Sequence, residues 1–222
     1  MIKKIIKKLL KKAGIYPPHY FKTSQQYWVA RYKRGGNSGA GSYHHLAEFK
    51  AAVVNKFIKE NKVSTVIEFG CGDGNQLKYF DIPFYVGYDI SPVAVKHCRK
   101  IFCKDKTKTF EMLSESAGST ADLTLSLDVI YHLVEDTTFM AYMERLFRAS
   151  EKFVIIYASN YDKQVIINGR PSHVRHRKFT EWVDTYAPEF GLVEHIPNKY
   201  PFKQEEPNST SFADFYIFRK QR

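Results

Sequence analysis

Short apolar runs alternate with longer stretches of helical spacing along most of this chain. Runs rich in β-branched and aromatic residues occupy residues 63–69, 84–88, 109–113, 121–127, 153–157, 192–196 and 212–218. Apolar runs of this length, separated by helix-like segments, are typical of buried strands in an α/β sheet. The pattern predicts an α/β domain of seven strands, with a long hairpin-like connection between the last two.

Three helices are expected, one before the first strand and two between strands. Residues 43–61 carry apolar side chains at helical spacing, and Ser42 is a candidate N-cap. A second helix begins at Pro92, with Ser91 as its N-cap. A third is expected to start near Asn75, directly after a glycine-rich turn.

The first 16 residues have a different pattern. In MIKKIIKKLLKKAG, isoleucines and leucines recur at i, i+3, i+4, i+7 and i+8, with lysine pairs between them. This predicts a basic amphipathic helical arm that Gly14 and Pro17–Pro18 end. Such an arm either lies on an anionic membrane through residues 1–13 or packs its apolar stripe on the body. Binding of RNA is a weaker alternative, because no aromatic residue or arginine interleaves the lysines.

Charge and composition agree with this division. The 222 residues carry a net charge of +11, yet no acidic residue precedes Glu48, and ten of the 34 basic residues lie before it. The body is therefore nearly neutral. Three cysteines without CxxC spacing indicate neither a disulfide framework nor a metal site, and favour a reducing, cytoplasmic compartment. No apolar run reaches the roughly 20 residues that cross a bilayer.

The segment between arm and body contains aromatic residues followed by glycines, in YWVARYKRGGNSGAGS. Glycine, serine and asparagine predict an irregular loop. Tyrosine and tryptophan are unusual in a linker, so we expect this loop to fold over a ligand as a lid, the alternative being a flexible connection. The expected organisation is an arm at 1–16, a lid segment and leading helix at 17–61, and a catalytic domain at 62–222.

The stretch VIEFGCGDGNQ, residues 66–76, indicates a nucleotide site. A dinucleotide fingerprint would place its third glycine at position 75, which is Asn75. The spacing GxGxG after Glu68 therefore favours a smaller zwitterionic ligand. Glu68 has no evident structural role at the end of an apolar strand. Asp89 follows the second strand, where a carboxylate accepts hydrogen bonds from ribose hydroxyls.

EFGCGDG, the strand-tip Asp89, SLDVIYHL and the seven strands together resemble a class I S-adenosylmethionine-dependent methyltransferase over about residues 62–220. The layout looks like small bacterial members that act on surface glycans. The resemblance implies a doubly wound, Rossmann-like sheet of order 3-2-1-4-5-7-6 with strand 7 antiparallel, and S-adenosylmethionine as cofactor. The cofactor-binding residues it implies are Glu68, Gly70, Cys71, Gly72, Asp89, Ile90, Ser114, Asp128 and Val129, with Tyr27 and Arg31 from the lid.

Transfer to a hydroxyl group benefits from a base, and histidine suits this task. The candidates are His132, after the fourth strand, and His173 and His176 in the loop expected after the fifth strand. In an extended segment His173, Arg175 and Arg177 share one side, where arginines suit an anionic acceptor. We assign Arg175, Arg177 and Tyr131 to substrate binding.

These features favour a methyltransferase that acts on a hydroxyl of an anionic sugar, nucleotide-sugar or lipid-linked glycan, with the arm holding it at the inner face of the plasma membrane. The chain lacks the [DNS]PP[YFW] and Pro-Cys motifs of enzymes that methylate nucleic-acid bases. Nucleic acid is therefore not the expected partner. Two alternatives stay open: an RNA methyltransferase that uses the arm as its basic handle, and a non-catalytic scaffold that binds S-adenosylmethionine.

Overall fold

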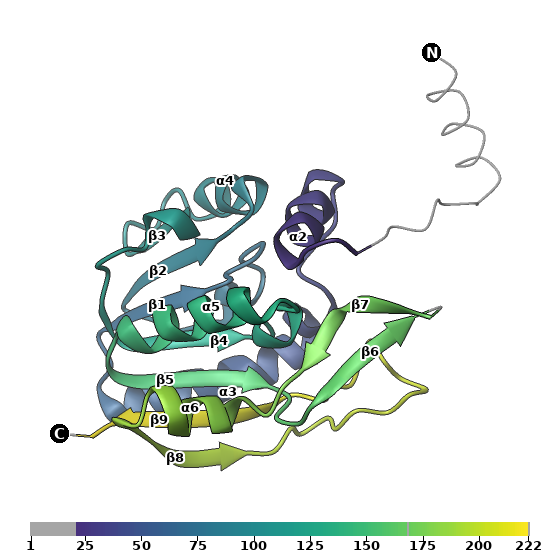
Figure 1. Ribbon diagram of the computed structural model, residues 1–222. Coiled ribbons are helices and arrows are strands. Elements are labelled where there is room, and N and C mark those ends of the chain that lie inside the picture. The colour runs from purple at the N-terminus through teal and green to yellow at the C-terminus, as the bar shows by residue number, and fades with distance from the viewer. Residues whose placement is uncertain (1–20, 168, 222) are drawn as a thin grey trace.

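The computed structural model describes residues 21–167 and 169–221, so the predicted arm lies outside the described residues (Figure 1). The chain forms one large sheet, a separate two-stranded hairpin and helices between the strands. The helices and short 3-10 turns are α2 (Ser24–Lys33), η1 (Ala40–Ser42), α3 (His44–Asn61), η2 (Gln76–Tyr79), α4 (Pro92–Ile101), η3 (Leu113–Glu115), η4 (Ile130–His132), α5 (Asp136–Arg148) and α6 (Phe179–Tyr186). The strands are β1 (Thr65–Phe69), β2 (Phe84–Asp89), β3 (Lys108–Met112), β4 (Ala121–Leu127), β5 (Ser150–Ala158), β6 (Lys163–Ile167), β7 (Arg170–His176), β8 (Phe190–Ile196) and β9 (Asp214–Lys220).

The large sheet has seven strands in the order β3-β2-β1-β4-β5-β9-β8. The first five strands run parallel to their neighbours, whereas β9 is antiparallel to both β5 and β8. The order and the antiparallel seventh strand confirm the predicted fold. The strand order reverses between β1 and β4, so their carboxyl ends open onto a crevice, which is where such sheets bind ligands.

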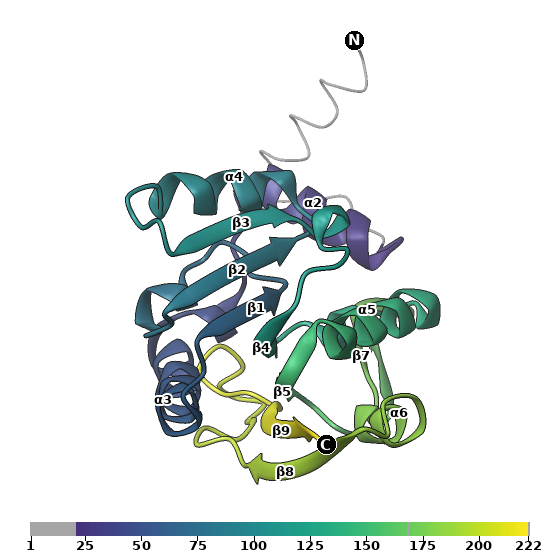
Figure 2. The same ribbon diagram turned by 90° about the vertical axis from the view of Figure 1, so that its left-hand side faces the viewer.

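Helices cover both faces of this sheet, with α3 on one side and α5 and α6 on the other (Figure 2). The core under α3 and α4 is built from residues such as Val54, Val95 and Leu125. The core under α5 and α6 includes Met143, Leu146 and Phe179, none of them exposed. Burying apolar surface on both faces explains why the strands read as continuous apolar runs rather than as alternating ones.

Two predicted helix starts differ from the structure. The helix expected near Asn75 is only the four-residue turn η2. Eight residues separate Asn75 from β2, and Pro83 disfavours helical backbone at the residue before it, so a longer helix has no room. Ser42 does not cap α3, because it ends η1 and the N-cap is Tyr43. Ser91, by contrast, caps α4 by accepting a hydrogen bond from the Ala94 amide.

The lid segment is more ordered than predicted. The expected irregular loop contains the helix α2, and only the residues after it form a glycine-rich turn and η1. Thr23 caps α2, its side chain accepting a hydrogen bond from the amide of Gln26. The Thr-x-x-Gln spacing at residues 23–26 is a capping-box signature in the sequence, and it was the missed signal.

The basic segment after β5, expected as a loop, is the strand β7. It pairs antiparallel with β6, with Lys163 opposite His176 and Ile167 opposite Arg170. This hairpin projects from the large sheet below α2 (Figure 1).

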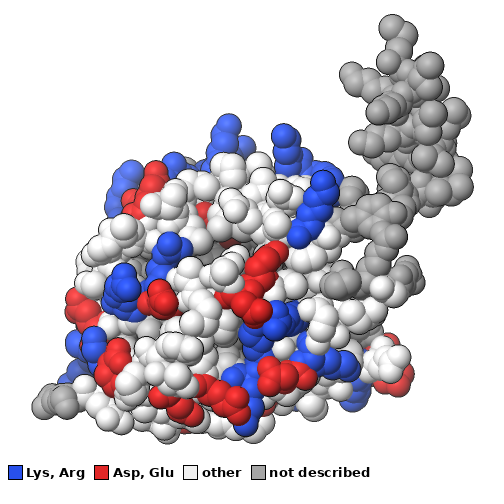
Figure 3. Space-filling view, viewed as in Figure 1, with Lys and Arg blue, Asp and Glu red and all other residues white. Residues whose placement is uncertain are grey.

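Charges of both signs are mixed over the face shown in Figure 3, and lysines and arginines prevail along its upper edge, where α2 and α4 lie. Neither helix contains an acidic residue. No described helix has the length and apolar character that crossing a bilayer requires.

Candidate active site

A cavity of about 1220 Å³ opens at the carboxyl ends of β1, β2 and β4. Its walls come from the glycine turn after β1, the tip of β2, η3, the segment after β4, one side of α5 and the lid helix α2. Small-molecule pockets usually enclose roughly 300–1,000 Å³, so this cavity is larger than most. Of the predicted cofactor residues, those that line it are Gly70, Cys71, Gly72, Asp89, Ile90, Ser114, Asp128 and Val129.

The glycine turn is shaped for close approach. Gly70 and Gly72 have φ angles of 88° and 60°, which disfavour a side chain. A Cβ on Gly72 would lie 2.3 Å from Ser38 Oγ and 2.9 Å from the hydroxyl of Tyr32. The turn is therefore packed against the lid, and a side chain at position 72 would collide with it.

Asp89 ties the tip of β2 to this turn. One of its carboxylate oxygens accepts a hydrogen bond from the Gly72 amide over 3.0 Å, and the other accepts one from the Ser91 amide over 2.8 Å. Burial raises the pKa of Asp89 to about 6, against the effect of these backbone donors. Asp89 also lines the cavity, and a carboxylate oxygen accepts more than one hydrogen bond, which suits a pair of ribose hydroxyls.

Glu68 differs from its predicted role, because it does not line the cavity. Its carboxylate accepts hydrogen bonds from the hydroxyl of Tyr85 over 2.6 Å and from Nε2 of Gln76 over 2.8 Å. Burial raises its pKa to about 7. Glu68 thus has a structural role that the sequence did not reveal, because it belongs to a buried hydrogen-bond network behind the glycine turn. Gln76, which lines the cavity, lies between Glu68 and the cavity.

Asp128 lines the cavity with a backbone φ of 61°. It forms an ion pair with Lys50, whose side chain is completely buried, and it accepts a hydrogen bond from the Tyr131 hydroxyl over 2.7 Å. Tyr131, predicted to bind substrate, does not line the cavity because this bond holds it beneath Asp128. The Lys50 ammonium also lies 5.3 Å from the ring centroid of Tyr157.

Of the three candidate bases, His132 lines the cavity. Its Nδ1 lies 3.1 Å from the main-chain carbonyl oxygen of His173. A carbonyl only accepts hydrogen bonds, so Nδ1 carries the proton and Nε2 of the neutral ring keeps a lone pair. Burial, assisted by neighbouring His173, lowers the pKa of His132 to about 3, which keeps the ring neutral at physiological pH.

His173 and His176 do not line this cavity. The His173 ring is stacked between Tyr27 and His132, with centroids 4.1 Å and 5.2 Å away. His176 is buried, and its Nδ1 lies 2.6 Å from Ser159 Oγ. Burial lowers the pKa of each to about 4. Their positions indicate packing roles. His173 supports the ring of His132, and His176 is a buried residue at the end of β7.

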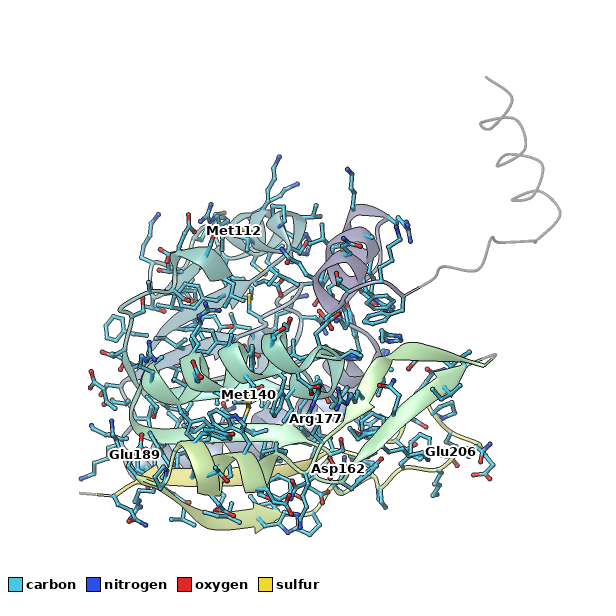
Figure 4. The ribbon with its side chains drawn as sticks, viewed as in Figure 1. Met112, Met140, Asp162, Arg177, Glu189 and Glu206 are labelled. Atoms are coloured by element: carbon cyan, nitrogen blue, oxygen red, sulfur yellow. The ribbon has the colours of Figure 1, made fainter. Side chains whose placement is uncertain are left out.

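The two arginines predicted to form an anion-binding fork are engaged within the protein. Arg175 and Arg177 both form ion pairs with Asp136 at the start of α5, at 2.9 Å and 3.0 Å. Both also donate to main-chain carbonyl oxygens of residues 133–134. Figure 4 labels Arg177, which lies between β7 and α5. The pair therefore fastens the hairpin to α5 and does not present a free fork to the cavity.

The lid closes over the cavity and is held at both ends. At the start of α2, the amide and hydroxyl of Ser24 donate to the two carboxylate oxygens of Glu135, over 2.9 Å and 2.7 Å. After α2, Asp73 accepts hydrogen bonds from the Ser38 amide and the Tyr43 hydroxyl. Burial alone would raise the pKa of Asp73, but these donors outweigh it and the pKa is lowered.

The two lid residues predicted to bind cofactor lie elsewhere. Tyr27 and Arg31 line a second cavity of about 840 Å³ on another side of α2. Arg31 donates to the carbonyl oxygen of Asn37 over 2.6 Å and stabilises the glycine-rich turn. The helical spacing of α2 directs Trp28 and Tyr32 to the main cavity instead. An extended or irregular segment would not have separated these residues in this way.

Comparison with known proteins fits this geometry. A family model described as a methyltransferase domain matches residues 43–201. No curated protein sequence matched the chain.

Three solved structures illustrate the fold likeness. N-methyltransferase NodS from Bradyrhizobium japonicum, with S-adenosylhomocysteine bound, is 12% identical, has a TM-score of 0.63, and covers 90% of this chain and 100% of its own. Magnesium protoporphyrin IX methyltransferase from Synechocystis, also with S-adenosylhomocysteine bound, is 14% identical and has a TM-score of 0.62. The match covers 89% of this chain and 97% of that one. The methyltransferase domain of bacterial CtHen1 is 17% identical at a TM-score of 0.58, covering 80% and 100%.

The chain therefore belongs to the methyltransferase-domain family and is an S-adenosylmethionine-dependent methyltransferase. The residues present fit this cofactor on two counts. The buried carboxylate of Asp89 lines the cavity at the tip of β2, and one buried side-chain oxygen, Oε1 of the cavity-lining Gln76, has no hydrogen-bond partner within the described residues. In the part of the chain that the structure describes, no three histidine, cysteine, aspartate or glutamate residues are grouped to hold a metal ion.

Proposed function

We propose that this methyltransferase acts on a hydroxyl group of a sugar-containing acceptor, with His132 as the base. The observation that carries the proposal is the hydrogen bond from His132 Nδ1 to the His173 carbonyl, which leaves Nε2 of this cavity-lining ring as an acceptor. The bound cofactor supplies an activated methyl group on its sulfonium. Binding two reactants in one enclosed cavity lowers the entropic part of the barrier.

The low pKa of His132 is compatible with this role. A hydroxyl oxygen becomes strongly acidic once it has gained a methyl group, so a weakly basic imidazole is sufficient to take its proton. The ring is held in place by stacking on His173 and by edge contact with Trp28, whose centroid is 4.9 Å away. His173 thus acts as a positioning residue, through its carbonyl and its ring.

The part of the cavity between α2 and α5 supports a sugar as the acceptor. Its lining combines the Trp28 indole with uncharged polar side chains: Thr23, Gln25, Gln26, Thr137 and Thr138. An aromatic face with amide and hydroxyl partners suits a polyhydroxylated ring. Lys33 and Arg145 also line the cavity, and neither forms an ion pair in the described part of the chain. In place of Arg175 and Arg177, they are our candidates for balancing a negative charge on the acceptor.

RNA is the second candidate acceptor. The solved small RNA methyltransferase HEN1 is 18% identical at a TM-score of 0.60 and covers 82% of this chain, although only 26% of its own. The basic residues of α2 and α4 and the lysine-rich arm supply positive charge that would favour a polyanion. We nevertheless prefer a glycan acceptor, because the uncharged lining near His132 offers few cationic partners for a phosphate backbone.

The test is transfer of labelled methyl groups from S-adenosylmethionine to separate fractions of nucleotide-sugars, lipid-linked glycans, total RNA and protein. We expect label in a sugar methyl ether that survives mild alkali. Label in RNA would replace this proposal with the second candidate. Absence of S-adenosylhomocysteine with every fraction would favour a non-catalytic binding protein.

We further propose that the enzyme works in the cytoplasm at the inner face of the plasma membrane, with the amphipathic arm as its contact. Residues 1–13 support this through their sequence pattern of apolar stripe and lysine pairs.

A further inference from the structure

A buried amide beside the glycine turn has an unused hydrogen-bond acceptor. Gln76 is 4% exposed and lines the main cavity. Its Oε1 has no hydrogen-bond partner and is the single such buried side-chain atom in the described chain. An unpaired buried acceptor costs free energy, so its persistence points to a partner that arrives with a ligand.

The orientation of this amide is fixed by its neighbours. Nε2 donates to Glu68 Oε1 over 2.8 Å, and the other oxygen of Glu68 accepts a hydrogen bond from the Tyr85 hydroxyl over 2.6 Å. A reversed amide would place its oxygen against the Glu68 carboxylate, with two acceptors facing each other. Tyr85, Glu68 and Gln76 therefore form a chain that turns Oε1 away from Glu68.

The ligand group that fits this acceptor carries N–H or O–H donors. S-adenosylmethionine has the adenine amino group, the α-ammonium group and the ribose hydroxyls, of which the hydroxyls are already assigned to Asp89. Asp89, the candidate ribose partner, is bound to the far side of the glycine turn through the Gly72 amide, and Ser114 lies beyond it after β3. Gln76 instead contacts Glu68 in β1, the strand between β2 and β4, and the Glu68 carboxylate lies near the charges of both Lys50 and Asp89. Because β1 is two strands away from β3, after which Ser114 lies, the α-ammonium group and not the adenine amino group is the donor that fits Gln76.

We propose that Gln76 accepts a hydrogen bond from the α-ammonium group of S-adenosylmethionine, and that Glu68 is the positioning residue that aims it. The Glu68 carboxylate thus acts on the cofactor indirectly, through the side-chain amide of Gln76. This inference rests on the cofactor but not on the identity of the acceptor or on His132.

Two ligands separate the proposal from a general effect on the site. S-adenosylhomocysteine carries the ammonium group, and 5′-methylthioadenosine lacks the whole amino-acid portion. We expect Gln76→Leu to weaken calorimetric binding of S-adenosylhomocysteine by at least about tenfold, the usual effect of losing a hydrogen bond to a charged group. Binding of 5′-methylthioadenosine should change less than about twofold. Gln164→Leu, the same exchange in β6 outside the cavity, should alter neither affinity.

Glu68→Gln tests the aiming role. A glutamine at position 68 would accept from Tyr85 and donate to Gln76 Oε1, which occupies the free acceptor. This variant should therefore show the same selective loss of affinity for S-adenosylhomocysteine. The double variant, with Glu68→Gln and Gln76→Leu, should lose no more affinity than either single variant. Thermal unfolding checks that each variant is folded. Equal losses for both ligands, or full affinity for S-adenosylhomocysteine in folded Gln76→Leu, would overturn the proposal, whereas failure of methyl transfer to glycans would not.

Discussion

At the scale of single residues, His132 shows how a local contact defines chemistry. The carbonyl of His173 fixes the protonated nitrogen, and burial keeps the ring neutral. Neither fact is visible in the sequence, which offers His132, His173 and His176 as candidates. The structure separates them because only His132 follows β4 directly at the cavity, whereas β7 carries His173 and His176 away from it.

His132→Phe keeps the aromatic contacts with His173 and Trp28 but removes Nε2. We expect kcat to fall by about 10²- to 10⁴-fold, the usual contribution of a base, with unchanged affinity for S-adenosylhomocysteine. Since the pKa of His132 is about 3, the ring stays neutral above pH 5, and the loss should be the same from pH 6 to 9. Protonation would remove the base only in acid.

The matched control is His176→Phe, the same exchange at a histidine outside the cavity, which should retain most of the activity. Full kcat in His132→Phe, or loss of product binding together with kcat, would contradict the assigned role. The comparison uses whichever acceptor fraction gains the label.

Which site residues the sequence predicts depends on where they lie along the strands. Gly70, Gly72, Asp89 and Asp128 could be located because strand ends in a parallel sheet meet at one edge. The neighbours that complete the site, Lys50 and Tyr32, come from segments whose packing the sequence does not encode locally. The hydrogen-bonding role of Glu68 could not be predicted for the same reason, because its partner Tyr85 lies on a neighbouring strand.

At the scale of elements, we predict that the lid helix α2 controls access to the cavity. Its start is bound to Glu135 and the turn after it to Asp73, so the segment is attached at both ends. Release of one attachment should let the helix move without disturbing the sheet. The hairpin of β6 and β7 is a second such element, fastened to α5 by Arg175 and Arg177.

Glu135→Ala removes both hydrogen bonds to Ser24. We expect faster amide hydrogen exchange over residues 24–34 and release of S-adenosylhomocysteine accelerated on the order of tenfold in stopped-flow measurements, because hydrogen bonds to a charged group are lost. Glu60→Ala, which removes an exposed partner of Lys56 on α3, is the control. If exchange and release stay as in the parent protein, α2 is not the gate.

The strands were predictable to within a few residues, because burial on both faces gives them continuous apolar runs. Helix α2 and the hairpin were not. Aromatic and glycine residues around α2 obscured the capping-box signature at residues 23–26. The basic residues of β7 match neither the pattern of a buried strand nor that of an alternating one. Their conformation depends on contacts with η4 and α5, which belong to the tertiary structure.

At the scale of the whole molecule, charge is unevenly placed. The sequence has ten basic and no acidic residues before Glu48, and α4 adds Lys96, Arg99 and Lys100 on the edge that α2 shares. A molecule of this kind approaches an anionic surface in a preferred orientation. The proposed membrane contact combines this attraction with the apolar stripe of the arm.

Flotation with vesicles tests that contact. The intact chain should float with phosphatidylglycerol-containing vesicles, and less at high salt, since surface attraction is screened. Replacing Ile5 and Ile6 by serine keeps every lysine but removes part of the stripe, and should sharply reduce retention. Equal retention of parent and variant would contradict insertion of the arm and leave only electrostatic attraction.

The central claim is that the glycine turn and Asp89 bind S-adenosylmethionine, and isothermal titration of the full chain tests it most directly. We predict that S-adenosylhomocysteine binds, that NAD does not, and that Asp89→Ala weakens the former by more than about a hundredfold through loss of charged hydrogen bonds. Uptake of NAD by a protein that ignores S-adenosylhomocysteine, or undiminished binding in folded Asp89→Ala, would contradict the account.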